Sequence, residues 1–219
     1  MIAKIGTRPI RTAANVTPAI ILIGFMGAGK SSVGRRLAER LGWTFEDLDE
    51  RIENRERRKV HEIFRESGES AFRLAECAAL RELLSEVQAG SRKVLALGGG
   101  AFIQEENARL IEAAGFPTVF LDAEVKELWR RCQQQADREC MERPLLSSLS
   151  RFRELYKIRR PQYARAALYQ PTDGKAVDEI AVELTEMLGL PSNDPRQRGE
   201  REPGPKKQVV KLRKRGEKN

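Results

Sequence analysis

The sequence predicts an α/β protein of three layers, in which helices cover both faces of a five-stranded parallel sheet. Short apolar runs recur along the chain, and most are followed by a stretch with apolar residues at helical spacing. Strands that alternate with helices are typical of a parallel sheet covered on both faces. Glycines directly follow two of the runs. Ligands of such sheets bind at the carboxyl ends of the strands, so these glycine segments mark the expected site.

The first half of the pattern starts with residues 19–23, whose continuous apolar character predicts a buried strand. A glycine-rich turn follows, and after it comes a helix face with an apolar residue at every fourth position, namely Val33, Leu37 and Leu41. A second apolar run covers residues 43–45. The long helical stretch beyond it places four residues on one face: Phe72, Ala75, Ala79 and Leu83.

The second half contains three further strands. Residues 94–97 form the third and end at a run of three glycines, and residues 118–121 form the fourth. The fourth leads through Asp122 into a helix whose apolar positions are Val125, Leu128, Trp129 and Cys132. The fifth, at residues 167–169, has the weakest pattern. The helix after it carries Ile180, Leu184, Met187 and Leu188.

Length and composition predict one folded domain, over residues 19–190, because 219 residues with 40% hydrophobic content suit a single core. The longest apolar stretch, residues 19–29, is well short of the roughly 20 residues that a membrane-spanning helix needs. The three cysteines, Cys77, Cys132 and Cys140, form no CxxC pair and have no metal-ligand spacing with His61. We therefore expect reduced thiols, a cytoplasmic location and no membrane contact.

The net charge of +8 comes from the two ends of the chain. Residues 1–18 carry +3, residues 195–219 carry +7, and the part between them carries −2. We expect residues 1–18 to be a flexible leader, with a targeting peptide as the alternative. Residues 191–219 are rich in proline, glycine and charge, which predicts a disordered basic tail. Such a tail is usually only solvated, and contact with RNA or an acidic surface is the alternative.

Residues 24–31 read GFMGAGKS, a full match to the phosphate-loop pattern GxxxxGK[ST]. The match lies between a predicted strand and a predicted helix, as its mechanism requires. Its glycines let successive backbone N–H groups point inward, and the helix N-terminus adds partial positive charge. Lys30 is expected to reach the terminal phosphates of a nucleotide, and the Ser31 hydroxyl to ligate Mg²⁺. A glycine-rich turn that ends in Lys-Ser by chance is the much weaker interpretation.

Two further segments at strand ends are candidates for the acceptor site. Alternation along an extended chain would place Asp47 and Asp49 on one side, about 7 Å apart, where one carboxylate serves the metal and the other an acceptor hydroxyl. A solvated helix cap before residues 50–54 is the alternative for these two acids. Three glycines at 98–100 would let a backbone approach a ligand closely, and a simple tight turn is equally compatible with them.

Six segments together resemble, in order, the motifs of the shikimate kinase family: GFMGAGKSSVGRRLA, DLDERIE, EIFRESGESAFRLAE, LALGGGAF, ERPLL and RRPQY. They span roughly residues 19–188, and their order is far more specific than any one of them. The resemblance implies a P-loop kinase fold like that of nucleoside monophosphate kinases. It also implies transfer of the γ-phosphate of ATP, with Mg²⁺, to the 3-hydroxyl of shikimate, on the route to chorismate and the aromatic amino acids.

The resemblance also implies roles for single residues. Asp49 would bind shikimate hydroxyls and act as the base, and Asp47 would support Mg²⁺ together with Ser31. Arg73 and Arg159 would hold the substrate carboxylate, since guanidinium groups match carboxylates in a planar fork. The rest of the acceptor pocket would be Gly98, Gly99 and Gly100. The ATP contacts would be Gly27, Ala28, Gly29, Lys30, Ser31, Ser32 and the lid residue Arg143, with Lys30 and Arg143 also counted as catalytic.

The chain departs from the family pattern between Arg131 and Arg143, where the segment is longer than the usual lid. The resemblance implies that Arg131, at the start of this longer segment, packs against the adenine of ATP. If the match to the family motif shifts by one residue, Arg160 takes the role of its neighbour Arg159. His61 replaces a small or apolar residue, and we interpret it as a partly exposed helix residue rather than a catalyst.

Three other functions compete with this interpretation. A related kinase for gluconate or another polyol would share the phosphate loop without the triple glycine and the paired arginines. A non-catalytic nucleotide-binding module would use the basic tail on nucleic acid. A purely structural role ranks last, because it leaves Asp49, Arg73, Arg143 and Arg159 unexplained. The preferred interpretation is a monomer that binds ATP and shikimate and requires no nucleic acid.

Overall fold

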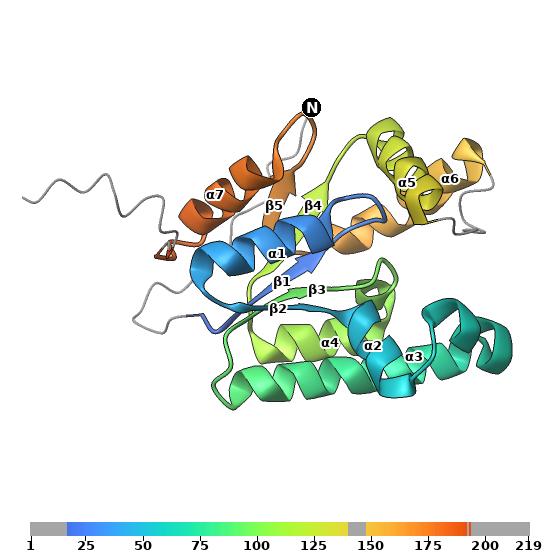
Figure 1. Cartoon of the computed structure of the whole chain (residues 1–219), viewed down its shortest axis with the longest axis horizontal. Helices are drawn as coiled ribbons and strands as arrows, with labels where there is room; N and C mark the ends of the chain where they lie inside the picture. Colours follow the sequence, from blue (N-terminus) through green and yellow to red (C-terminus); the bar gives the residue numbers. More distant parts are fainter. Residues whose placement is uncertain (1–16, 140–147, 192, 194–219) are drawn as a thin grey trace, which may run out of the picture.

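The computed structural model describes residues 17–139, 148–191 and 193. Arg143, Cys140, almost all of the leader and almost all of the tail therefore lie outside the described residues. Within the described ranges, five parallel strands form one sheet in the order β2-β3-β1-β4-β5. Figure 1 shows α1 and α7 on one side of this sheet and α3 and α4 on the other. The predicted three-layer α/β architecture is confirmed.

The sheet is built from short strands, and the central ones are buried throughout. β1 (Ala19–Ile23), β3 (Lys93–Ala96) and β4 (Thr118–Asp122) have every residue buried. β2 (Thr44–Asp47) and β5 (Leu168–Pro171) lie at the two edges and are partly exposed. Burial on both faces explains why the central strands are mostly apolar, whereas the edge strands have weaker patterns.

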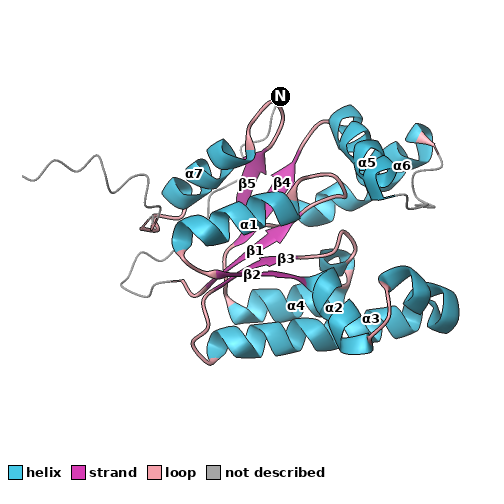
Figure 2. Ribbon diagram, viewed as in Figure 1, coloured by secondary structure: helices cyan, strands magenta, loops and turns pink. Residues whose placement is uncertain are grey.

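Helices follow the strands as the periodicity indicates, and Figure 2 shows how much of the chain they take up. The predicted ones are α1 (Lys30–Leu41), α3 (Val60–Gln88), α5 (Val125–Glu139) and α7 (Val177–Met187). α2 (Leu48–Glu56) corresponds to the helix that was only the alternative for Asp47 and Asp49. α4 (Glu105–Ala114), α6 (Leu149–Tyr163) and the 3₁₀ turn η1 (Ala101–Ile103) are not predicted from the sequence. His61 lies exposed on α3, as expected, whereas Met187 on α7 is 43% exposed although its position predicts a core contact.

The sheet order places the two glycine segments beside each other. β1 pairs with β3 in parallel, with Leu22 opposite Ala96, so both strands end at the same edge of the sheet. β2 pairs with β3 on the other side, with Asp47 opposite Ala96. The segments that follow these three strands therefore meet at one edge, as ligand sites of parallel sheets do. Within the described ranges no helix is both long enough and apolar enough to cross a membrane.

Helix α3 is interrupted at Gly68, whose φ of 79° and ψ of 174° are not helical. This backbone conformation is essentially restricted to glycine. A Cβ at this position would meet nothing within 4 Å, so any cost of a side chain there is conformational rather than steric. The break separates the first eight residues of α3 from the part that carries Arg73.

We expect Gly68→Ala to lower the free energy of unfolding by about 1–3 kcal/mol, because alanine strongly disfavours this backbone conformation. Urea unfolding followed by circular dichroism measures the effect. Ser70→Ala is the matched control, since Ser70 is exposed and lies within the regular helix just beyond the break. A Gly68→Ala protein as stable as the wild type would contradict the assigned conformation.

Candidate active site

The phosphate loop, residues 24–31, connects β1 to α1 and depends on glycine at three positions. Gly24, Gly27 and Gly29 have φ values of 147°, 79° and 90°. A Cβ on Gly24 would lie 2.4 Å from the Leu121 carbonyl oxygen, and one on Gly27 would lie 2.5 Å from that of Leu128. Gly29 is the N-cap of α1 and provides no side-chain cap, so the first N–H groups of this helix remain available to an anion.

Lys30 lies at the first position of α1 and folds back over the loop. Its ammonium group donates to the carbonyl oxygens of Gly24 at 3.0 Å and Phe25 at 3.1 Å. Burial lowers the pKa of this ammonium group, and the negative charges of Asp49 and Asp47 oppose that shift. A cation is therefore held in the centre of the loop, where the terminal phosphates of a nucleotide would need it.

The Ser31 hydroxyl donates to Asp47 Oδ2 at 2.7 Å, so the two predicted metal-site residues are in direct contact. Asp47 is the last residue of β2 and the N-cap of α2, and its Oδ1 accepts the backbone N–H of Asp49 at 3.0 Å. Hydroxyl and carboxylate oxygens are the hard donors that Mg²⁺ prefers, and this ion usually completes its shell with water and phosphate. The pair fits that chemistry.

The predicted extended conformation through Asp49 is wrong. β2 ends at Asp47, and Asp49 lies in the first turn of α2. The Asp47 carboxylate favours this helix start because it satisfies a backbone N–H that no helical carbonyl can reach. The helix cap that competed with a site role for these acids is therefore present, and the same carboxylate also contacts Ser31 of the phosphate loop.

The Asp49 side chain lies against the glycine segment, residues 98–100, which follows β3. A Cβ on Gly98 would be 2.6 Å from Asp49 Oδ1, so only glycine permits this approach. Burial raises the pKa of the Asp49 carboxyl to about 6, the charge of Asp47 adds to the shift, and Lys30 opposes it. A carboxylate that titrates near neutral pH at the edge of a nucleotide site is suited to general base chemistry.

The glycine segment also meets the two predicted carboxylate-binding arginines. A Cβ on Gly100 would lie 3.0 Å from both terminal nitrogens of Arg73, which comes from α3. The Gly99 carbonyl oxygen accepts from Arg159 Nη1 at 3.5 Å and from the Tyr163 hydroxyl, both from α6. One short segment thus brings together an acid from α2 and arginines from α3 and α6.

Arg73 is held by acids that sequence reasoning missed. Its Nη1 donates to both carboxylate oxygens of Glu76 at 3.1 Å, and its Nη2 donates to Glu69 at 3.0 Å. Glu76 is 1% exposed and also accepts from Asn107 Nδ2 at 3.2 Å. Glu69 and Glu76 stand four residues before and three residues after Arg73, a helical spacing that could have identified both acids. No sequence pattern indicates Asn107.

The two adjacent arginines of α6 have different surroundings. Arg159 reaches the glycine segment, whereas Arg160 Nε donates to Asp122 Oδ2 at 3.2 Å and contacts the Tyr156 hydroxyl at 3.0 Å. The Tyr156 hydroxyl in turn donates to Asp122 Oδ1 at 2.7 Å. Arg159 is therefore the member of the pair that lies with Asp49 and Arg73 around the glycine segment.

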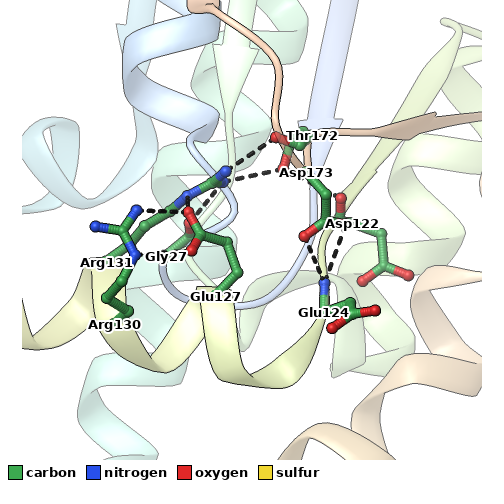
Figure 3. Close-up of polar contacts among 8 residues, drawn as sticks. All are labelled: Gly27, Asp122, Glu124, Glu127, Arg130, Arg131, Thr172 and Asp173. Carbon is green, nitrogen blue, oxygen red and sulfur yellow. Dashed lines mark hydrogen bonds and ion pairs between the residues drawn. The ribbon is translucent and has the colours of Figure 1, made fainter.

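Arg131 lies beside the phosphate loop, near Gly27 and Thr172, as Figure 3 shows. Its Nη2 donates to the Thr172 carbonyl at 2.9 Å, its Nε to Glu127 at 2.7 Å, and its Nη1 reaches the Gly27 carbonyl at 3.5 Å. These contacts fix the edge of the guanidinium plane between α5, the loop and the segment after β5. Among the remaining predicted nucleotide contacts, Ala28 is buried in the loop and Ser32 is exposed on α1.

The family model and the curated relatives that match this chain belong to one family. The family model described as shikimate kinase matches residues 26–189. A shikimate kinase from Symbiobacterium thermophilum is 40% identical over 186 residues, which cover 83% of this chain and 98% of that protein. One from Thermus thermophilus is 41% identical over 172 residues, 77% of this chain and 89% of that protein. A solved shikimate kinase from Acinetobacter baumannii, in complex with shikimate, superposes with a TM-score of 0.69 at 34% identity, over 78% of this chain and 93% of that one.

Proposed function

This chain belongs to the shikimate kinase family of ATP-dependent kinases, and we propose that its site transfers the γ-phosphoryl group of ATP to the 3-hydroxyl of shikimate. The products are 3-phosphoshikimate and ADP. The observation that carries this proposal is the glycine segment, which gathers Asp49, Arg73 and Arg159 beside the phosphate loop. An acid and two arginines are the groups that a hydroxylated carboxylate requires.

The phosphate loop binds the nucleotide. Backbone N–H groups of Gly27, Ala28 and Gly29, with the exposed start of α1 at Ser31 and Ser32, surround the β- and γ-phosphates. Lys30 neutralises charge that develops on the transferred group. Mg²⁺ would be held by Ser31 and Asp47, and its charge would offset the negative charge of the phosphates. Arg143, outside the described residues, is proposed to close over the phosphates.

The acceptor lies on the glycine segment with its carboxylate between Arg73 and Arg159. Asp49 accepts the proton of the 3-hydroxyl as that oxygen attacks the γ-phosphorus. The bond between the γ-phosphorus and the β–γ bridging oxygen breaks, and ADP leaves with its electron pair. Close packing of Asp49 on Gly98 and of Arg73 on Gly100 fixes both groups before the substrate arrives.

The adenine end of the nucleotide is proposed to stack on Arg131. Hydrogen bonds to Thr172, Glu127 and Gly27 occupy the edge of this guanidinium group, and a planar cation held by its edge presents its faces for stacking. The free thiols of Cys77 and Cys132 support a cytoplasmic location.

The experiment that tests this function measures ADP release in a coupled assay with MgATP and either shikimate or gluconate. We expect rapid release with shikimate, little with gluconate, and a phosphorus NMR signal from a phosphate on the 3-hydroxyl. Rapid release with gluconate and none with shikimate would favour the polyol kinase instead. ATP binding without release on any acceptor would favour a nucleotide-binding module.

Arg73→Lys is expected to raise the KM for shikimate at least about tenfold with little change in the KM for ATP. An ammonium group cannot make two parallel contacts with a carboxylate, and it cannot keep the paired contact with Glu76. Steady-state kinetics with each substrate varied in turn measures the effect. Arg109→Lys is the matched control, because Arg109 is exposed on α4 and pairs only with Glu105 among the described residues. An unchanged KM for shikimate would reject the role of Arg73.

A further inference from the structure

We infer that Asn107, which touches no substrate in the proposed complex, is a positioning residue for the acceptor carboxylate and acts through Glu76 on Arg73. This inference rests on the proposed function, because it assigns Arg73 to the acceptor. Asn107 lies in the first turn of α4 and is 1% exposed. Its Nδ2 donates both to Glu76 Oε2 at 3.2 Å and to the Ala101 carbonyl at 3.1 Å.

These two bonds join the two parts of the acceptor pocket. Ala101 directly follows the glycine segment and starts η1, whereas Glu76 belongs to α3 and holds Arg73. Arg73 in turn packs on Gly100. The contacts therefore form a closed ring from Gly100 through Ala101, Asn107, Glu76 and Arg73 back to Gly100. Asn107 is the only member of this ring that bonds to both the glycine side and the arginine side.

The orientation of the Asn107 amide follows from its partners. Both are acceptors, a carbonyl oxygen and a carboxylate oxygen, so only the NH₂ end fits between them. Among the described residues, Asn107 Oδ1 has no hydrogen-bond partner although it is buried. A buried amide oxygen without a partner costs stability. The Asn107 side chain is thus destabilising at Oδ1, whereas its Nδ2 makes two hydrogen bonds beside the acceptor pocket.

Glu76 needs such a donor because it is a buried carboxylate. Burial raises the pKa of Glu76, and the nearby charge of Asp49 adds to the shift. Arg73 lowers the pKa, and the Asn107 hydrogen bond lowers it further. Without Asn107 the Glu76 carboxylate would be less favoured in its charged form. Arg73 would then be held less firmly against the glycine segment.

Gln170 offers a matched control elsewhere in the molecule. It lies on β5, is 1% exposed, and also has a buried amide oxygen without a partner. Its Nε2 donates to a carbonyl, that of Pro171 at 3.1 Å, and to a carboxylate, that of Glu183 at 2.6 Å. Asn107→Leu and Gln170→Leu therefore remove the same kinds of hydrogen bond, but only Asn107 lies beside Glu76 and Arg73.

The test compares Asn107→Leu, Gln170→Leu, Glu76→Gln and the double variant of Glu76 and Asn107 in the shikimate-dependent assay. We expect Asn107→Leu to raise the KM for shikimate about tenfold, the size of one lost buried hydrogen bond to a charged group, and to leave the KM for ATP within about twofold. Gln170→Leu should leave the KM for shikimate unchanged. In the Glu76→Gln background, Asn107→Leu should change this KM by less than about threefold, because its partner is already altered.

Two results would overturn the inference while leaving the proposed function intact. One is an active Asn107→Leu enzyme with a normal KM for shikimate, and the other is an equal effect of Asn107→Leu with and without Glu76. A wild-type enzyme that releases no ADP with shikimate would overturn the proposed function and the inference together. If Asn107→Leu does not accumulate as folded protein, Asn107→Ser replaces it in the same cycle.

Discussion

Asp49→Asn is expected to lower kcat for shikimate phosphorylation by about 10²- to 10⁴-fold, the usual contribution of a general base. The amide keeps the size of the side chain and its packing on Gly98, but it cannot accept the hydroxyl proton. Nucleotide affinity should be preserved, because the phosphate loop and the contact between Ser31 and Asp47 do not involve this side chain. Rapid-quench kinetics together with calorimetric titration of ADP separates the two effects.

The same residue predicts a pH dependence. Burial raises the pKa of Asp49 to about 6, and the base must be deprotonated to act. The value of kcat/KM for shikimate should therefore be nearly constant above pH 7 and fall about tenfold per pH unit well below 6. The Asp49→Asn protein should lose this acidic limb. Asp178→Asn, which changes an exposed acid on α7, should retain it. A collapse of ADP affinity in Asp49→Asn would contradict the base assignment.

Lys30→Ala is expected to lower kcat/KM for ATP by about a hundredfold or more, because the only lysine of the phosphate loop is lost. The Gly24 and Phe25 carbonyls already hold the ammonium group over the loop, so little free energy is needed to position it during the reaction. Lys157→Ala is the control, since Lys157 is exposed on α6. Steady-state turnover at saturating shikimate measures both variants. Near-normal activity of Lys30→Ala would contradict the assignment of residues 24–31 to the phosphates.

The elements that could be predicted from the sequence are those whose packing leaves a regular pattern. β1 was predicted with its exact bounds because all five residues are apolar and buried. The predicted second strand starts one residue before β2 and extends through Asp49, whereas β2 ends at Asp47, because this edge strand has only Phe45 as a strong apolar signal. α4 escaped prediction because its buried face includes the polar Asn107. α6 escaped because Pro161 lies within it, where proline is normally unfavourable.

The site shows the same division between local and tertiary information. The position of the phosphate loop between β1 and α1 depends on neighbours in sequence and could be predicted. Asp47 and Asp49 were identified as candidates, but their conformation was wrong because a helix cap replaced the expected extended chain. Arg159 and Arg160 differ by about 100° around one helix, and only their neighbours, Gly99 and Asp122, distinguish them. Glu76 stands at helical spacing from Arg73 within α3, a pattern that could have identified it, whereas Asn107 contacts Glu76 from another helix, for which no local pattern exists.

The central claim is that the acceptor lies on the glycine segment between Asp49 and the two arginines, facing the phosphate loop. A crystal structure with MgADP and shikimate tests it most directly. We predict the shikimate carboxylate within hydrogen-bond distance of Arg73 and Arg159, and its 3-hydroxyl within hydrogen-bond distance of Asp49 and directed at the β-phosphate of ADP. Shikimate bound away from residues 98–100, or with its carboxylate at Arg160 instead of Arg159, would contradict the account.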